Sequence, residues 1–429
     1  MRWLILALAA IPAAAIWATL VFVGAANGWW RTPLAPPGET AAFAAAVADR
    51  LDRANRGNAA FRLIEAGRVA SEHYVSIGEP VGPDTLFQMA SVSKWVTAWG
   101  VMKLVEDGAV DLDAPIETYL TRWSLPASEF DRTGVTVRRL LSHTAGLTDG
   151  LGYEGFRPGT DVQPLEASLD QAADAMAGAD GRTRVGLEPG SEWRYSGGGY
   201  ALLQLLIEEV SGQPFARYMS ERVLTPLGMA DSTFEITPPD PPNLATFYDR
   251  SGEPAPHFRF SAPSAAGLYS TTADLTRFVR AHATDHPGGP AGAGVLEPDT
   301  LARMFTPTAA VLGTDIWGLG VMLYAPNGAG GHIVGHEGSN APAINTSVRV
   351  DPATGDGIVL LVTGHPSLAG ELGSEWVFWR TGRLDTMDYV RSTGRTVLII
   401  GVGWLVIAGA VVIIGWRATR RRTPGAEDT

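Results

Sequence analysis

Apolar residues concentrate at the two ends of the chain, with a mixed apolar and polar body between them. Residues 3–26 and 396–416 are stretches of 24 and 21 positions without a charged side chain. A helix of about 20 apolar residues crosses the hydrocarbon core of a bilayer, so each segment predicts a membrane-spanning helix. Neither contains an ionisable residue, which favours anchors over an ion or proton path such as a transporter would need.

The residues beside these segments predict an orientation. Four arginines follow the second segment: Arg417, Arg420, Arg421 and Arg422. The positive-inside rule places that tail in the cytoplasm and the body on the extracytoplasmic side of the plasma membrane. The first segment is predicted to be an uncleaved anchor, although "VGAA" at 23–26 also suits signal peptidase. We divide the chain into an anchor or signal segment (1–30), a body (31–390) and a membrane helix with a basic tail (391–429).

Within the body, periodicity predicts helices and strands in a definite order. Helical periodicity is found at 40–55, 91–106, 201–212 and 370–381. Strand-like runs are found at 61–78, with a turn at Gly67, and at 317–324, 332–338, 344–350 and 356–363. Strands at both ends with helices between them predict an α+β fold, in which the N- and C-terminal parts close one sheet around a helical insert. By length, the body is two domains or one domain with two lobes.

Composition excludes several classes of function. The formal net charge of −12 argues against a nucleic-acid partner, because phosphate binding needs a basic face. The chain has no cysteine, which excludes disulfides, thiolate metal sites and a cysteine nucleophile. His332 and His336 are four residues apart, but the glycines around them argue against a helical zinc pair. We expect neither a metal nor an organic cofactor, since the serine, lysine and tyrosine chemistry described below is self-contained.

Lysine is rare in this chain, and one lysine stands beside a serine. Only two of the 33 basic residues are lysines, Lys94 and Lys103. Ser91 and Lys94 are three positions apart at the start of a predicted helix, so their side chains share one face. A buried lysine amine can lose its proton and act as a base, whereas arginine cannot. The pair is either an S-x-x-K nucleophile with its base or a helix-capping serine beside an ordinary lysine.

Two later stretches add candidate chemistry. In "EPGSEWRYSGGGYALLQ" (188–204), Tyr195 precedes a glycine-rich turn that leads into an apolar helix. Such a tyrosine exchanges protons with a nearby serine if a cationic neighbour lowers its pKa; otherwise it is a buried tyrosine at the start of a helix. "GHEGSNAPA" (335–343) is strand-like and ends in small residues. The chain contains no G-x-S-x-G, which excludes the serine of an α/β-hydrolase.

Taken in order, five stretches resemble the successive motifs of the serine β-lactamase-related family. They are "FQMASVSKWVTA", "LLSHTAGL", "EPGSEWRYSGGGY", "AAGLYSTTADLTRFV" and "GHEGSNAP". The resemblance covers about residues 40–382, and the family includes class C β-lactamases, D,D-carboxypeptidases, D-aminopeptidases and esterases. It implies a β-lactamase/transpeptidase-like fold: an antiparallel sheet flanked by helices, with a separate helical lobe and the active site in the cleft between them.

The resemblance also implies roles for individual residues. Ser91 is the expected nucleophile, Lys94 its activating partner, and Tyr195 the general base and then acid. Backbone N–H groups of Ser91 and Ser339 are expected to form the oxyanion hole. Three more positions are expected to bind substrate: His336, Gly338 and Gly197.

Two departures from the family pattern bear on the substrate. Gly197 stands where many members have an asparagine that contacts the substrate amide. His336 stands where lactamases usually have a lysine, so the site has less positive charge to bind a substrate carboxylate. Both favour a D-amino-acid peptide or ester, which includes cell-wall peptides, over efficient β-lactam hydrolysis. His143, in "SHTAGL", is expected to shape the fold rather than to react. The alternative is a penicillin-binding-type sensor or cell-wall peptide-binding protein that acylates slowly or not at all.

Overall fold

The computed structural model describes residues 2–420 except 151, 238, 284–288 and 312. Arg421 and Arg422 of the basic tail lie outside the described residues. The chain forms two units, which are described separately below. One is the body, Leu34–Thr381, and the other combines the two ends of the chain, Met1–Pro33 and Gly382–Thr429.

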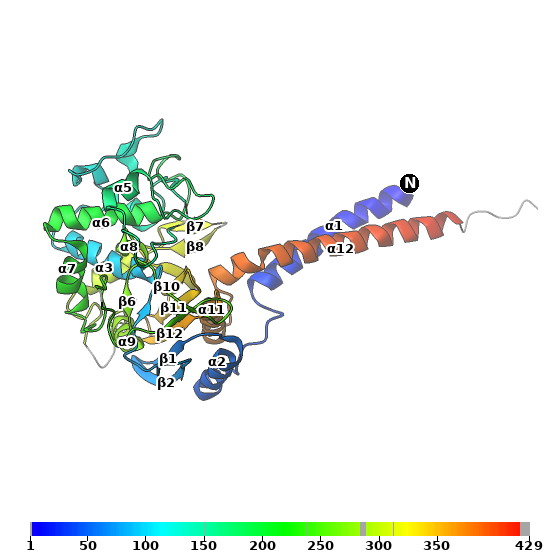
Figure 1. The fold of residues 1–429 in the computed structure, drawn as a ribbon. Coiled ribbons are helices and arrows are strands. Elements are labelled where there is room, and N and C mark those ends of the chain that lie inside the picture. The colour runs from blue at the N-terminus through cyan, green and yellow to red at the C-terminus, as the bar shows by residue number, and fades with distance from the viewer. Residues whose placement is uncertain (1, 151, 238, 284–288, 312, 421–429) are drawn as a thin grey trace, which may run out of the picture. The chain divides into compact units, whose positions relative to one another are not determined.

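The body is built on an antiparallel sheet in which the first and last strands along the chain meet. Within the described residues this sheet has eight strands in the order β2-β1-β12-β11-β10-β9-β8-β7 (Figure 1). They are β1 (Ala59–Glu65), β2 (Arg68–Val75), β7 (Ala309–Val311), β8 (Thr314–Trp317), β9 (Met322–Pro326), β10 (His332–Asn340), β11 (Ile344–Asp351) and β12 (Asp356–Thr363). Strand β1 pairs with β12, so N- and C-terminal parts close one sheet, as predicted.

Helices cover both faces of this sheet. The helices of the body are α2 (Thr40–Ala54), α3 (Val92–Glu106), α4 (Val137–Leu141), α5 (Leu165–Asp170), α6 (Gly197–Ser211), α7 (Phe215–Met219), α8 (Pro263–Ala266), α9 (Thr272–Arg280), α10 (Pro298–Phe305) and α11 (Leu368–Thr381). Helices α2 and α11 pack on one face, and α3 and α9 on the other. Helices α6 and α8 pack against α3 and form the lobe with α4, α5 and α7. This confirms the predicted α+β architecture with a helical lobe.

Two short strand pairs lie outside the main sheet. Strand β3 (Phe87–Gln88) pairs with β6 (Tyr269–Ser270), and β4 (Phe247–Tyr248) pairs with β5 (Pro254–Ala255). The β3–β6 pair matters for the site because β3 ends immediately before the turn that leads into α3. That turn carries Ser91.

The burial of each element explains its pattern of apolar residues. Every residue of β11 and β12 is buried, because helices cover both faces of the sheet there. Helix α3 is apolar almost all round, since it lies between the sheet and the lobe. The predicted hairpin turns at Ala66 and Gly67, which both have positive φ, at +46° and +71°.

Two predicted boundaries were wrong. The run 317–324 was predicted as one strand, but β8 ends at Trp317 and β9 begins at Met322. The intervening turn contains Gly320 at φ +76° and is held by the Leu319 N–H, which donates to the Met304 carbonyl (2.9 Å). The helix predicted at 201–212 begins four residues earlier, at Gly197, because the Ser196 hydroxyl accepts a hydrogen bond from the Gly199 N–H and caps it.

The unit formed by the chain ends consists of two helices, α1 (Arg2–Ala26) and α12 (Thr386–Arg420). Both are long and apolar enough to cross a membrane. The helices pack together: the Trp17 indole N–H donates to the Ile399 carbonyl (3.3 Å), and the Trp404 indole N–H donates to the Ala14 carbonyl (3.0 Å). At Gly403 the pair is in such close contact that a Cβ would lie 1.8 Å from the Trp17 Nε1 atom.

Candidate active site

Ser91 lies on a strained turn between β3 and α3. Ala90 has φ +47°, in the left-handed region that residues with a Cβ rarely enter. The turn makes Ser91 the residue that precedes the first turn of α3, where backbone N–H groups lack helical acceptors. Within the described part of the chain, the Ser91 N–H donates no hydrogen bond. Ser91 lines a cavity of about 410 Å³, so its hydroxyl is accessible to a ligand.

Lys94 lies directly behind Ser91 in the same cavity wall. Its Nζ atom is 3.3 Å from the Ser91 Oγ atom and donates to the Ala265 carbonyl at 2.7 Å. The side chain is buried, and burial lowers the pKa of Lys94 to about 7, against a smaller raising effect from the Asp149 carboxylate. A substantial share of this amine is therefore unprotonated at neutral pH and able to accept a proton from Ser91.

Tyr195 completes the group from the turn before α6. The Lys94 Nζ atom lies 5.0 Å from its ring centroid. Burial raises the pKa of Tyr195 well above its ordinary value, and the interaction of its hydroxyl with Ser91 opposes this only in part. The condition of a pKa lowered by a cationic neighbour is not met, because the loss of hydration is the larger effect. Tyr195 is thus a neutral phenol, suited to donate a proton.

His143 supports the Tyr195 ring. The two rings lie 4.3 Å apart between centroids, and the His143 Nδ1 atom accepts a hydrogen bond from the Ser196 N–H (3.2 Å). Burial keeps the pKa of His143 well below its ordinary value, so the ring is neutral. The residue itself has φ +57°, which fixes the turn after α4. These contacts fit the expected shaping role.

Asp149 is a buried carboxylate that sequence reasoning missed. It accepts hydrogen bonds from the Ser196 hydroxyl and from the Gly198 N–H (2.8 Å), and so holds the start of α6. Burial raises the pKa of Asp149 above its ordinary value. The residue sits in an unremarkable "TDG" turn, and only the fold places that turn under Tyr195. No signal in the local sequence identifies it.

Strand β10 forms the opposite side of the site. A Cβ at Gly338 would lie 2.3 Å from the Met89 carbonyl oxygen and 3.0 Å from the Ala90 Cβ atom. Glycine at this position therefore lets the strand close onto the turn that carries the nucleophile. The next residue, Ser339, is exposed and lines the same cavity as Ser91.

His336 and Gly197 are close to the group but buried. His336 is 1% exposed, and its Nδ1 atom donates to the Glu337 carbonyl (2.6 Å). Burial and, to a smaller extent, the Lys94 charge lower the pKa of His336 to about 3, so it carries no positive charge at neutral pH. Gly197 is covered by the Tyr153 ring. The residues that line the cavity include Ser91, Lys94 and Ser339, but neither of these two.

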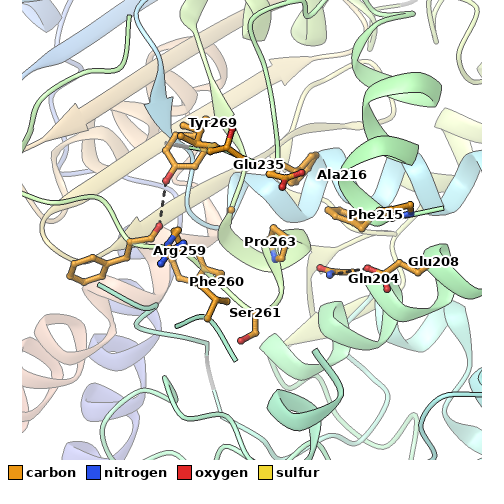
Figure 2. A pocket seen from close by; sticks show the side chains of 17 residues that line it. Gln204, Glu208, Phe215, Ala216, Glu235, Arg259, Phe260, Ser261, Pro263 and Tyr269 are labelled. Atoms are coloured by element: carbon orange, nitrogen blue, oxygen red, sulfur yellow. Dashed lines mark hydrogen bonds between the residues drawn. The ribbon is translucent and has the colours of Figure 1, made fainter. Parts of the chain in front are cut away.

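A second cavity of about 410 Å³ contains none of the predicted site residues. Figure 2 shows its lining, which includes Phe215, Pro263 and Tyr269. The two cavities share α8 as a wall: Ala265 and Ala266 line the first, and Pro263 lines the second. The second cavity therefore borders the segment whose Ala265 carbonyl binds Lys94, but the reactive groups lie in the first.

Comparisons with known proteins agree with this geometry. The family model described as Beta-lactamase matches residues 43–375. Penicillin-binding protein 4 of Amycolatopsis lactamdurans is 33% identical over 304 residues, 67% of this chain and 74% of that protein. Esterase EstB of Burkholderia gladioli is 34% identical over 189 residues, 42% of this chain and 45% of the esterase. The structure of SurE with D-Leu superposes with a TM-score of 0.59 at 27% identity, covering 80% of this chain and 75% of SurE. The chain therefore belongs to the beta-lactamase family of serine hydrolases.

Proposed function

We propose that this protein is a membrane-anchored, extracytoplasmic hydrolase that forms an acyl-enzyme on Ser91 with D-amino-acid peptides or esters. The observation that carries the proposal is the buried Lys94 amine, 3.3 Å from the Ser91 hydroxyl and with its pKa lowered to about 7. The apolar helices α1 and α12 support membrane anchoring. Arg417 and Arg420, at the end of α12, support a cytoplasmic location of that end.

The reaction follows from the positions of the three side chains. Unprotonated Lys94 accepts the Ser91 proton as the Ser91 oxygen bonds to the substrate carbonyl carbon. The charge that develops on the carbonyl oxygen is received by backbone N–H groups of Ser91 and Ser339. The bond to the leaving nitrogen or oxygen then breaks, and Tyr195 donates its phenol proton to that atom and regains one from Lys94.

Hydrolysis of the acyl-enzyme uses the same groups in reverse. A water molecule gives a proton to the Tyr195–Lys94 pair and bonds to the acyl carbon. The bond to the Ser91 oxygen breaks, and Ser91 recovers its proton from Lys94.

Two observations support D-amino-acid substrates over β-lactams. His336 is neutral, so it supplies no positive charge for the carboxylate that penicillins and cephalosporins carry. Relatives with this fold include an esterase and a structure determined with D-Leu. Cell-wall peptides, which contain D-amino acids, fall within this substrate class.

A time course of intact mass tests the proposal on the full-length protein in detergent. The probes are the p-nitrophenyl esters of D-leucine and L-leucine and a penicillin, each with Ser91→Ala as the control. We expect rapid nitrophenol release from the D-ester and an acyl adduct that forms only when Ser91 is present. Equal hydrolysis by Ser91→Ala would contradict the mechanism. A lasting penicillin adduct without ester turnover would instead identify a penicillin-binding sensor.

A further inference from the structure

A side chain at position 197 would crowd the ring of Tyr153. A Cβ at position 197 would lie 3.0 Å from the Tyr153 Cε2 atom and 3.2 Å from the Gly152 Cα atom, whereas ordinary Cβ contacts begin at 3.4 Å. Gly197 is the first residue of α6 and has a helical backbone that any residue adopts. The Tyr153 ring, and not the backbone conformation, therefore disfavours a side chain at position 197.

Tyr153 is held in this position from its other side. It forms an antiparallel bridge with Ala175, and the neighbouring Glu154 N–H donates to the Asp174 carbonyl at 2.7 Å. The ring is 9% exposed, so it is packed on most of its surface. A Cβ at position 197 would require this held ring to shift by a few tenths of an ångström.

The exposed edge of Tyr153 faces the cavity that contains Ser91. The cavity has both apolar and polar lining. Its other apolar residues are Met176, Ala265, Ala266, Ala341, Pro342, Ala343 and Pro366, and its polar residues include Glu154, Arg250 and Asn340. Burial raises the pKa of Tyr153 well above its ordinary value, so it stays a neutral ring. A substrate bound to Ser91 therefore meets an aromatic and apolar surface in the place where a side chain at 197 would otherwise reach it.

We propose that Tyr153 is a specificity-determining residue: it fills the space of the missing side chain at 197 and selects substrates whose acyl group carries an apolar side chain of several carbons. This inference rests on the proposed acyl transfer to Ser91. Recognition comes from apolar area buried against the ring and not from a hydrogen bond to a side chain at 197.

Rates with two p-nitrophenyl esters test the selectivity. Hexanoate presents an apolar chain to the wall and acetate does not. We expect Tyr153→Ala to lower kcat/KM for the hexanoate at least tenfold more than for the acetate, and Tyr153→Phe to keep the parental preference. Equal losses on both esters, or a loss of preference in Tyr153→Phe, would overturn the proposal.

A second measurement tests the crowding without any catalysis. Gly197→Asn should lower the melting temperature by a few degrees and should lower it much less in the Tyr153→Ala background. Additive shifts would show that the ring does not fill this space. If no ester acylates Ser91 at all, the proposed function and the proposed selectivity both fail. The melting temperatures of the single and double variants still test whether the Tyr153 ring crowds position 197.

Discussion

At the scale of single residues, burial distinguishes the two lysines of α3. Lys94 is 2% exposed and has its pKa lowered to about 7, whereas Lys103 pairs with Asp107 (2.7 Å) and has its pKa raised. We expect Lys94→Arg to lower kcat/KM by about 10²–10⁴-fold, because the charge stays but the base is lost. Lys103→Arg is the matched control on the same helix and should change the rate less than twofold. Retained activity in Lys94→Arg would exclude the amine as the base.

The pKa of Lys94 also sets a pH dependence of activity. The unprotonated amine is the reactive form, so kcat/KM should rise about tenfold per pH unit below pH 7 and level off above it. Hydrolysis of one ester between pH 5 and 9 measures this. A rate that falls as pH rises through 7 would mean that the protonated amine is required.

Folding stability should depend on pH through the same group. In the unfolded chain a lysine has a pKa near 10.4, so between about pH 7 and 10 the unfolded state binds more protons and stability rises with pH. Lys94→Met removes the buried amine. Its melting temperature should therefore exceed that of the parent at pH 7, by an amount that shrinks toward pH 10. A difference that is constant with pH would contradict the lowered pKa.

The sequence pattern predicted part of the site, but it did not predict the properties that depend on burial by distant segments. Ser91 and Lys94 could be paired from the sequence because three positions on a helix bring two side chains to one face. The supporting roles of Asp149 and the Ala265 carbonyl could not, because Asp149 lies in a turn and Ala265 in α8, each distant in sequence from the residues that it contacts. The direction of the Tyr195 pKa was also out of reach, since it depends on how completely other segments cover the ring.

At the scale of elements, the close contact between β10 and the turn before α3 fixes the position of the turn that carries Ser91. We expect Gly338→Ala to lower the free energy of unfolding by about 1–3 kcal/mol and to lower activity more than tenfold, because its methyl group would meet the Met89 carbonyl. Gly331→Ala is the matched control, since a Cβ there has only ordinary contacts, at 3.6 Å or more. Denaturant unfolding and ester hydrolysis measure the two effects. Equal stability of both variants would contradict this packing.

Elements with a long uniform pattern were predicted well, and those that depend on a single turn were not. The hairpin at 61–78 and the helix at 91–106 repeat their apolar period over many residues, so tertiary contacts reinforce the local preference. The break at 318–321 departs from a strand because the Leu319 N–H bonds to the Met304 carbonyl, a partner that local sequence does not reveal.

At the scale of the whole molecule, the packing of α1 against α12 leads us to predict that α1 stays in the mature protein and is not removed as a signal peptide. Gly403 gives the Trp17 indole the space to reach α12, so Gly403→Leu should separate the helices. The test uses a protease site engineered into residues 31–40. After cleavage, we expect α1 to co-elute with α12 in detergent for the parent and for the control Gly401→Leu, because no atom lies within 4 Å of a Cβ at Gly401. It should dissociate in Gly403→Leu. An intact mass of the membrane-purified parent without residues 1–26 would show that the segment is cleaved.

The pairing of β1 with β12 has a consequence for biosynthesis. Ala59 lies opposite Val362, so one edge of β1, the first strand made, has no partner in the sheet until β12, the last described strand, has been synthesised. During synthesis the β1–β2 hairpin therefore presents an open apolar edge that can pair with other chains. Contacts this distant in sequence also slow folding. A chain with this topology needs protection from aggregation until its last strand has emerged, wherever in the cell that happens.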